Sequence, residues 1–192
     1  MKEKVLLIDG HSMLNRGYYG LPLLTNSKGV HTNAVLGFLN IMLKVISEEQ
    51  PDYITVAFDE HAPTFRHRMY EAYKGTRHAM PDELKEQVPI IKDVLKSMDI
   101  RIISKEGLEA DDIIGTVSRI AMRDGKEAVI LSGDRDLLQL ATEDSVKVRL
   151  PHTSKGVTTV DILYAPDVEE KYGVTPAGII ELKALMGDSS DN

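Results

Sequence analysis

The chain has 192 residues, of which 42% are hydrophobic, which is enough for one domain with a buried core and somewhat short for two. It has no cysteine, so disulfide bonds and thiolate-bound zinc are excluded. Nothing resembles a signal peptide, and no segment approaches the roughly 20 apolar residues of a membrane span, so we expect a cytoplasmic protein without a membrane partner. The formal net charge of −7 argues against a nucleic-acid partner unless the acids serve a local purpose.

Short apolar runs alternate with helical patterns along the chain. The runs at 4–8, 53–58, 100–103 and 128–131 are typical of strands, and 146–150 with an edge hairpin over 157–163 extends the set. The spacing of apolar residues predicts helices over 32–47, 81–98, 109–124 and 176–186, and a short one over 137–141. The segment from about 10 to 29 is rich in Gly, Asn and Pro, which predicts a loop with at most one helical turn.

This alternation predicts an α/β fold, with a mostly parallel twisted sheet and helices on both faces. In such sheets, ligands bind beyond the carboxyl ends of the strands. Asp9 and Asp59 each follow a predicted strand, and Asp134 and Asp136 follow another. An isolated aspartate at a strand end usually caps the next helix or shapes a turn. Acids from several strands should nevertheless meet at one rim of the sheet.

The helix that begins near Glu109 has an unusually acidic start. Glu109, Asp111 and Asp112 fall in its first turn, beside an apolar face that we expect to include Ile113 and Ile120. Acids near a helix N-terminus are favoured by about 0.3 to 1 kcal/mol each, which explains one or two of them. Three together are equally well explained by a bound cation.

Several carboxylates at one rim would raise one another's pKa unless positive charge lies among them. Carboxylate oxygens and water suit Mg²⁺ or Mn²⁺, and the six histidines are too poorly spaced for a zinc site. Two such ions, roughly 3.5 to 4 Å apart, would activate water and stabilise the attacking and leaving oxygens in phosphoester hydrolysis. We therefore expect phosphodiester cleavage.

The segment over 66–77 is a basic and aromatic island in this acidic chain. Four Arg or Lys residues stand there against one acid, and the island includes Arg66, Tyr70, Tyr73, Lys74 and Arg77. Such a segment offers cations to phosphates and rings to bases, although an ordinary solvated segment is an equally good reading of these residues alone. The candidate metal ligands number nine, more than the net charge of −7, so the rest of the chain is slightly basic and compatible with DNA.

Seven motifs in order resemble the 5′-nuclease domain of bacterial DNA polymerase I, in the flap-endonuclease and PIN-like superfamily. They are LIDGH at 7–11, VAFD at 56–59, PTFRH at 63–67, YKGTR at 73–77, EADD at 109–112, GDRDLLQL at 133–140 and LMGDSSDN at 185–192. The resemblance implies a PIN-like core and a two-metal 5′–3′ exonuclease or 5′-flap endonuclease. It also implies a role in DNA replication and repair, with a 5′ flap or 5′ duplex end as the partner.

The resemblance also implies roles for individual residues. One metal ion would be held by Asp9, Asp59, Glu109 and Asp111, and the other by Asp134, Asp136, Asp188 and Asp191. Asp112 would act indirectly or through water. Lys74, Arg77 and Asp111 would take part in catalysis, and Arg66, Tyr70, Tyr73, Lys74 and Arg77 would bind DNA in an arch over 60–82.

The chain is expected to form a single N-terminal catalytic domain over 1–192. In the family, a helix-hairpin-helix that grips duplex DNA comes next, followed by a polymerase region, and both are absent from this sequence. We therefore expect a fragment or a reduced version, normally fused to or associated with a polymerase region. Residues 1–192 alone should bind metal but cut flap DNA poorly.

Other readings of the same residues remain open. A PIN-type ribonuclease would use the same acids on RNA. The Asp134-x-Asp136 pair is also compatible with a magnesium-dependent phosphotransferase or phosphatase that forms an aspartyl-phosphate. A non-catalytic nucleic-acid-binding module would keep the scaffold without the chemistry.

Overall fold

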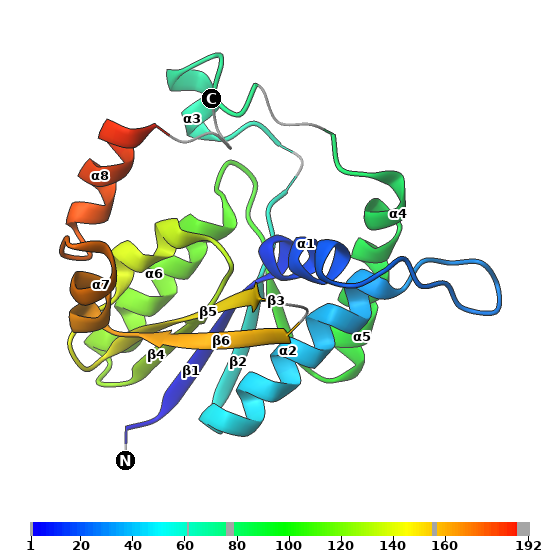
Figure 1. Ribbon diagram of the computed structural model, residues 1–192, viewed down its shortest axis with the longest axis horizontal. Coiled ribbons are helices and arrows are strands. Elements are labelled where there is room, and N and C mark those ends of the chain that lie inside the picture. Colours follow the sequence, from blue (N-terminus) through cyan, green and yellow to red (C-terminus); the bar gives the residue numbers. More distant parts are fainter. Residues whose placement is uncertain (1, 61, 76–78, 155–156, 188–192) are drawn as a thin grey trace.

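The computed structural model describes residues 2–60, 62–75, 79–154 and 157–187 (Figure 1). Its centre is a six-stranded sheet in the order β3-β2-β1-β4-β5-β6. The strands are β1 (Lys4–Asp9), β2 (Tyr53–Ala57), β3 (Arg101–Ile103), β4 (Glu127–Leu131), β5 (Val146–Ser154) and β6 (Val157–Leu163). All neighbours pair in parallel except β6, which runs antiparallel to β5. The predicted α/β class, the mostly parallel sheet and the edge hairpin are therefore confirmed.

Helices cover both faces of this sheet (Figure 1). Alternate residues of β1 point to opposite faces, so Leu6 and Ile8 enter one core cluster, and Val5 and Leu7 enter the other. The first face carries α1 (Gly10–Gly20), α2 (Asn33–Glu49), α4 (Asp82–Lys85) and α5 (Gln87–Ser97). The second carries α6 (Ala110–Arg123), the 3₁₀ helix η1 (Arg135–Leu140), α7 (Ala165–Tyr172) and α8 (Gly178–Met186). Within the described residues, no helix is both long and apolar enough to span a bilayer.

The prediction of a loop after residue 9 was wrong, because α1 occupies the first eleven residues of that segment. Asp9 caps the helix by accepting a hydrogen bond from the backbone N–H of Ser12 at 3.0 Å. Gly17 then lies against Gly37 of α2, so closely that a Cβ on Gly37 would stand 2.4 Å from the Cα of Gly17. The glycine content that suggested a loop therefore serves close packing of two helices.

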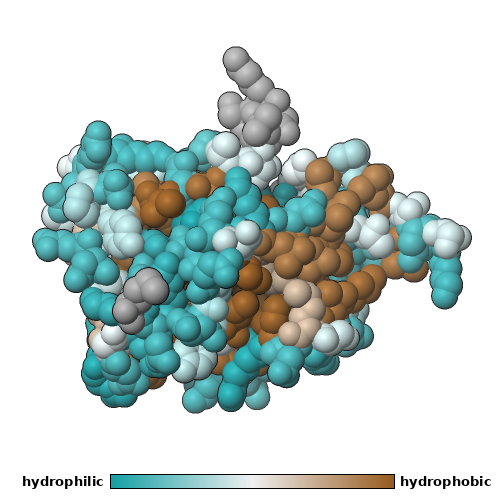
Figure 2. Space-filling model, turned by 90° about the horizontal axis from the view of Figure 1, so that it is seen from below, coloured by the Kyte–Doolittle hydropathy of each residue, from teal (hydrophilic) through white to brown (hydrophobic). Residues whose placement is uncertain are grey.

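Two leucines of α2 are exposed, although they fit the apolar pattern that predicted this helix. Leu36 keeps 43% and Leu43 48% of its accessible surface. Seen from below, the half of the molecule that carries α2 shows a broad apolar area, while the opposite half is largely hydrophilic (Figure 2). The buried surface of α2 comes instead from residues such as Phe38 and Met42.

The remaining helices follow the predicted pattern with local changes. The helix predicted over 81–98 is interrupted at Glu86, three residues before Pro89, which lacks the N–H needed to continue the ladder. Gly125 follows the end of α6 with a φ of +75°, the left-handed conformation that glycine adopts readily. The helices α3 (Phe65–Met69) and α7 were not predicted. A separate correction concerns Ile120 of α6, which was expected in the apolar face but is 42% exposed.

A prediction concerns the contact between α1 and α2. In Gly17→Ala, the new Cβ would stand 2.5 Å from the backbone oxygen of Ala34, so the helices must separate, at about 1 to 3 kcal/mol of folding stability. Thermal unfolding should show a lower Tm. In the control Gly20→Ala, the Cβ meets nothing within 4 Å, so the Tm should stay or rise. Equal Tm values for the two variants would contradict this account of the contact.

Candidate active site

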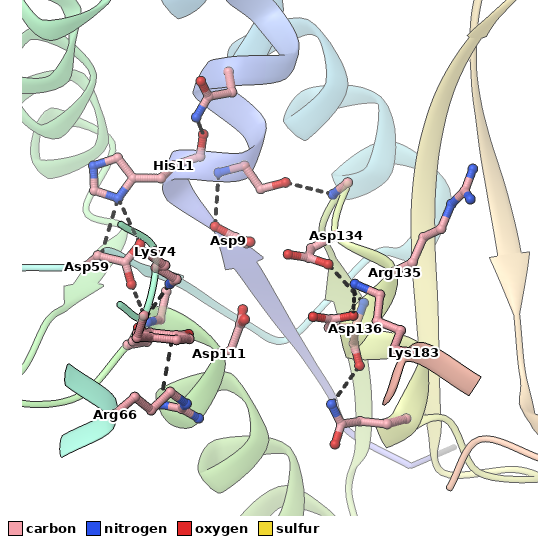
Figure 3. A pocket seen from close by; sticks show the side chains of 17 residues that line it. Asp9, His11, Asp59, Arg66, Lys74, Asp111, Asp134, Arg135, Asp136 and Lys183 are labelled. Atoms are coloured by element: carbon pink, nitrogen blue, oxygen red, sulfur yellow. Dashed lines mark hydrogen bonds and ion pairs between the residues drawn. The ribbon is translucent and has the colours of Figure 1, made fainter. Parts of the chain in front are cut away.

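A pocket of about 650 Å³ opens at the carboxyl ends of the central strands (Figure 3). It is lined by six aspartates or glutamates from four parts of the chain, together with basic and polar side chains. The acids are Asp9, Asp59, Glu109, Asp111, Asp134 and Asp136. The structure thus brings together, at one rim, every predicted metal ligand that it describes except Asp112.

Hydrogen bonds hold Asp9, at the end of β1, and Asp134, which follows the neighbouring strand β4. The two oxygens of Asp9 accept from the N–H of Ser12 at 3.0 Å and from the hydroxyl of Ser132 at 2.9 Å. Asp134 caps η1 by accepting from the N–H of Asp136 at 2.9 Å. Both aspartates therefore cap the helix that follows their strand, as isolated strand-end aspartates usually do. The same hydrogen bonds fix both carboxylates at the pocket.

Asp59 connects β2 to the start of α6. One of its oxygens accepts from the N–H of Ala110 at 2.7 Å, and the other lies 3.5 Å from Nδ1 of His11. Burial favours a higher pKa for Asp59, but the bonds from His11 and Ala110, with the charge of nearby Lys74, outweigh it and lower the pKa. Asp59 is therefore ionised at neutral pH.

Asp111 carries the least compensated charge in the pocket. Its side chain points into the open centre (Figure 3), and no described residue donates a hydrogen bond to it. Burial, reinforced by the charges of Asp9, Asp134 and Asp59, raises its pKa to about 8. Burial likewise raises the pKa of Asp9 to about 6, against the hydrogen bonds from Ser12 and Ser132. The pocket therefore has an unmet demand for positive charge.

The basic segment lies across the start of α6. Lys74 Nζ donates to Glu109 at 2.9 Å, and the hydroxyl of Tyr73 donates to the same carboxylate at 3.1 Å. Arg66, on α3 (Phe65–Met69), donates two hydrogen bonds of 2.8 Å to the two oxygens of Asp112. These bonds lower the pKa of Asp112. Asp112 consequently lies outside the pocket lining, as a support for Arg66.

Three predicted residues lie outside the described part of the chain, namely Arg77, Asp188 and Asp191. Tyr70 is described but is 58% exposed and does not line the pocket. The structure thus gathers Arg66, Tyr73 and Lys74 at the pocket wall and leaves Tyr70 apart.

Several pocket residues were missed in the sequence. Lys183 of α8 forms an ion pair with Asp136, although 47 positions separate them and nothing in the helical pattern marks this lysine. His11 and Ser12 could have been found, because they directly follow Asp9-Gly10 at the end of a predicted strand. Arg135 and Gln139 also line the pocket, from η1.

The donor set fits hard divalent cations better than other metals. Within the described residues, no three His, Asp or Glu side chains stand close enough together to enclose one ion as they are placed. Mg²⁺ usually keeps several waters and takes only one or two protein carboxylates, so a wide acidic pocket suits it. The uncompensated Asp111 and the absence of cysteine argue in the same direction.

A mostly parallel α/β sheet with aspartates converging beyond its strand ends is the arrangement expected of a PIN-like fold. The family described as 5′–3′ exonuclease, N-terminal resolvase-like domain, matches residues 4–173. The chain belongs to this 5′–3′ exonuclease family.

Similar proteins include DNA polymerases I of several bacteria. Over the whole chain, identity is 48% with the Bacillus subtilis enzyme and 39% with that of Mycobacterium leprae, and the chain spans about 21% of each. Among solved structures, the match to zinc-bound T5 5′-exonuclease covers 99% of this chain and 69% of the T5 chain, with a TM-score of 0.73 and 22% identity. The catalytic core of Rad2 with DNA matches 100% and 57%, with a TM-score of 0.54 and 18% identity. These structures share the fold.

Because Asp111 and Asp112 have different surroundings, we predict that their substitution by asparagine changes the Tm in opposite directions. The folded-state pKa of Asp111 lies above its ordinary 3.8, so folding takes up a proton between about pH 4 and 8. Its contribution to stability therefore falls as the pH rises through this window, and its full cost is present above pH 8. Asp111→Asn should raise the Tm in EDTA at pH 8.5, by about 2 to 4 °C for each kcal/mol of repulsion removed.

The matched control is Asp112→Asn, which weakens the two bonds to Arg66. Its Tm should fall at the same pH, on the order of 2 to 4 °C for a half-buried charge pair. At pH 4 the gain from Asp111→Asn should disappear, because the carboxyl is then protonated in the native protein. Scanning calorimetry at the two pH values measures both effects, and a gain independent of pH would contradict the electrostatic explanation.

Proposed function

We propose that this domain hydrolyses DNA phosphodiester bonds at 5′ ends or 5′ flaps, using two Mg²⁺ or Mn²⁺ ions. The observation that carries the proposal is the convergence of Asp9, Asp59, Asp111 and Asp134 on one pocket with too little positive charge to balance them. Membership of the 5′–3′ exonuclease family and relatives named DNA polymerase I support it. Solved relatives of the same fold also carry metal ions and DNA, as their names state.

The proposed ligands form two sets, one for each ion. Asp9, Asp59, Glu109 and Asp111 would hold one ion, and Asp134 and Asp136 would hold the other with Asp188 and Asp191. Bound divalent cations would activate water and stabilise charge on the attacking and leaving oxygens. Because the described acids are spread around the pocket wall, many of the contacts would pass through water.

The chain's own cations would position the phosphate. Lys74 and Arg66 stand beside the acids at the start of α6, and Arg135 lines the opposite wall from η1. A phosphate entering the pocket therefore meets fixed positive charge on two sides. In this proposal Lys74, Arg77 and Asp111 serve catalysis, and Arg66, Tyr70 and Tyr73 serve DNA binding.

The segment over 60–82 would form an arch above the pocket. Its described helix α3 lies beyond the carboxyl ends of the strands (Figure 1). The contacts of Lys74 with Glu109 and of Arg66 with Asp112 tie this segment to α6. Its cations would face a DNA strand that enters the site.

The chain spans about a fifth of the length of its relatives, so its partners are also a proposal. We propose that residues 1–192 form one catalytic domain that works with a polymerase region, in DNA replication and repair. A duplex-binding segment elsewhere would add affinity that the described residues do not supply.

The test is hydrolysis of a 5′-labelled flap duplex in Mg²⁺ or Mn²⁺, compared with EDTA. Metal-dependent cleavage is expected, and Asp111→Ala should lower its rate by roughly 100-fold or more, because loss even of a group that supports a ligand costs 10 to 100-fold. The control Asp93→Ala removes an exposed acid of α5 and should leave the rate unchanged. Preferential cleavage of single-stranded RNA would favour the ribonuclease instead, and binding by the full-length protein without any metal-dependent cleavage would refute a nuclease.

A further inference from the structure

A second groove, of about 680 Å³, lies beside the acidic pocket, between α6 and η1. The two hollows share Arg66, Asp111 and Gln139 in their linings, so they adjoin at the start of α6. From there the groove follows α6 toward its C-terminal end, where Arg123 lines it. A polymer bound in the pocket could continue into this groove without leaving the protein surface.

The charge of the groove changes along its length. Its acids, Asp111 and Asp112, lie at the end that joins the pocket, and Arg66 pairs with Asp112 there. Beyond that end, its lining carries two exposed arginines, Arg119 and Arg123, one turn of helix apart. Arg123 also pairs with Asp124 at 3.2 Å, which lies outside the lining, so the positive charge of this part of the groove rests mainly on Arg119, in a chain whose net charge is −7.

Apolar side chains stand between these cations. Ile120 and Met122 also line the groove, and they keep 42% and 37% of their surface exposed. Cations next to apolar side chains suit a chain with phosphates on one side and open base faces on the other. Duplex DNA hides its base faces, whereas a single strand exposes them.

Gly115 of α6 lines the groove one helical turn after Asp111, which lines both hollows. A Cβ there would meet only the methyl groups of Leu140, at 3.7 and 3.8 Å, which is ordinary contact. Packing therefore does not require this glycine, unlike Gly17 and Gly37, and alanine is the better helix former. The missing side chain leaves room for a bound strand at the junction of the two hollows.

We propose that the groove between α6 and η1 binds the single-stranded part of a nucleic acid whose scissile phosphate lies in the acidic pocket. The proposal rests on the proposed function for the position of that phosphate. Arg119 and Arg123 contact successive phosphates, Ile120 and Met122 contact bases, and Gly115 lets the strand pass from the pocket into the groove.

The test measures binding of a labelled single-stranded oligonucleotide of about 10 nucleotides, a typical single-strand site size, by fluorescence anisotropy in EDTA. The double variant Arg119→Gln/Arg123→Gln should bind on the order of 10-fold more weakly. A plot of the logarithm of its association constant against the logarithm of the salt concentration should be less steep by about 1.4. The control Arg101→Gln removes an exposed arginine of β3, outside the groove, and should bind like the unmodified protein.

A pair of glycine variants separates binding from folding. Gly115→Leu should weaken binding while leaving the Tm unchanged or higher, because its bulk enters the groove and not the core. Gly115→Ala should raise the Tm and keep the affinity. Unchanged affinity in the double arginine variant, or an equal loss in Arg101→Gln, would overturn the groove as a binding site.

Hydrolysis in Mn²⁺ distinguishes this proposal from the proposed function. A duplex with a single-stranded 5′ extension should be cut more slowly by the double arginine variant, whereas a blunt duplex should be cut at the unmodified rate. Equal slowing on both substrates would also overturn the groove. If no protein cuts either duplex but single-strand binding still requires Arg119 and Arg123, the nuclease assignment fails and the groove stands.

Discussion

The repulsion among carboxylates gathered at one rim of the sheet is the constraint on which the rest of the site depends. Asp111 lies among Asp9, Asp59 and Asp134, and burial, reinforced by the charges of these three acids, raises its pKa to about 8. Folding tolerates this because the neighbouring acids have structural bonds of their own. Asp9 caps α1, and Asp134 caps η1. The same side chains therefore shape the backbone and carry the charge of the site.

Several positive side chains around the pocket hold neighbouring segments in place through ion pairs. Arg66 and Lys74 fold the basic segment onto the start of α6 by pairing with Asp112 and Glu109, while Lys183 brings α8 to Asp136. None of these pairs neutralises Asp111, which faces the open centre. Glu109, Asp112 and Asp136 are thus paired with cations, whereas Asp111 at the centre of the pocket has no ion-pair partner among the described residues, an arrangement that favours a bound cation over another side chain.

Much of this architecture could be read from the sequence, because the information was local. Each central strand is a short apolar run that ends near an acid, so both the sheet and the rim followed from strand ends such as Ile8-Asp9 and Leu131 with Asp134. The helix α1 could not be read in this way. Its residues have weak helical propensity, and what stabilises it is a cap from Asp9 and a close approach of Gly17 to a distant helix.

Side-chain placement was less predictable than backbone structure, for a related reason. Ile120 and Leu36 fit the apolar pattern of their helices, but whether they are covered depends on elements that pack from elsewhere in the chain. Lys183 reaches Asp136 only because α8 packs beside η1. Helical periodicity describes one element, whereas these contacts depend on the relative position of two.

The edge strand β3 has a consequence for the behaviour of the protein in concentrated solution. It pairs with β2 over only three residues, from Arg101 to Ile103, and its first residue is charged. An unpaired strand edge can recruit a strand from another molecule, but three residues offer few backbone hydrogen bonds for such pairing. A short, charged border thus protects this side of the sheet against intermolecular strand addition.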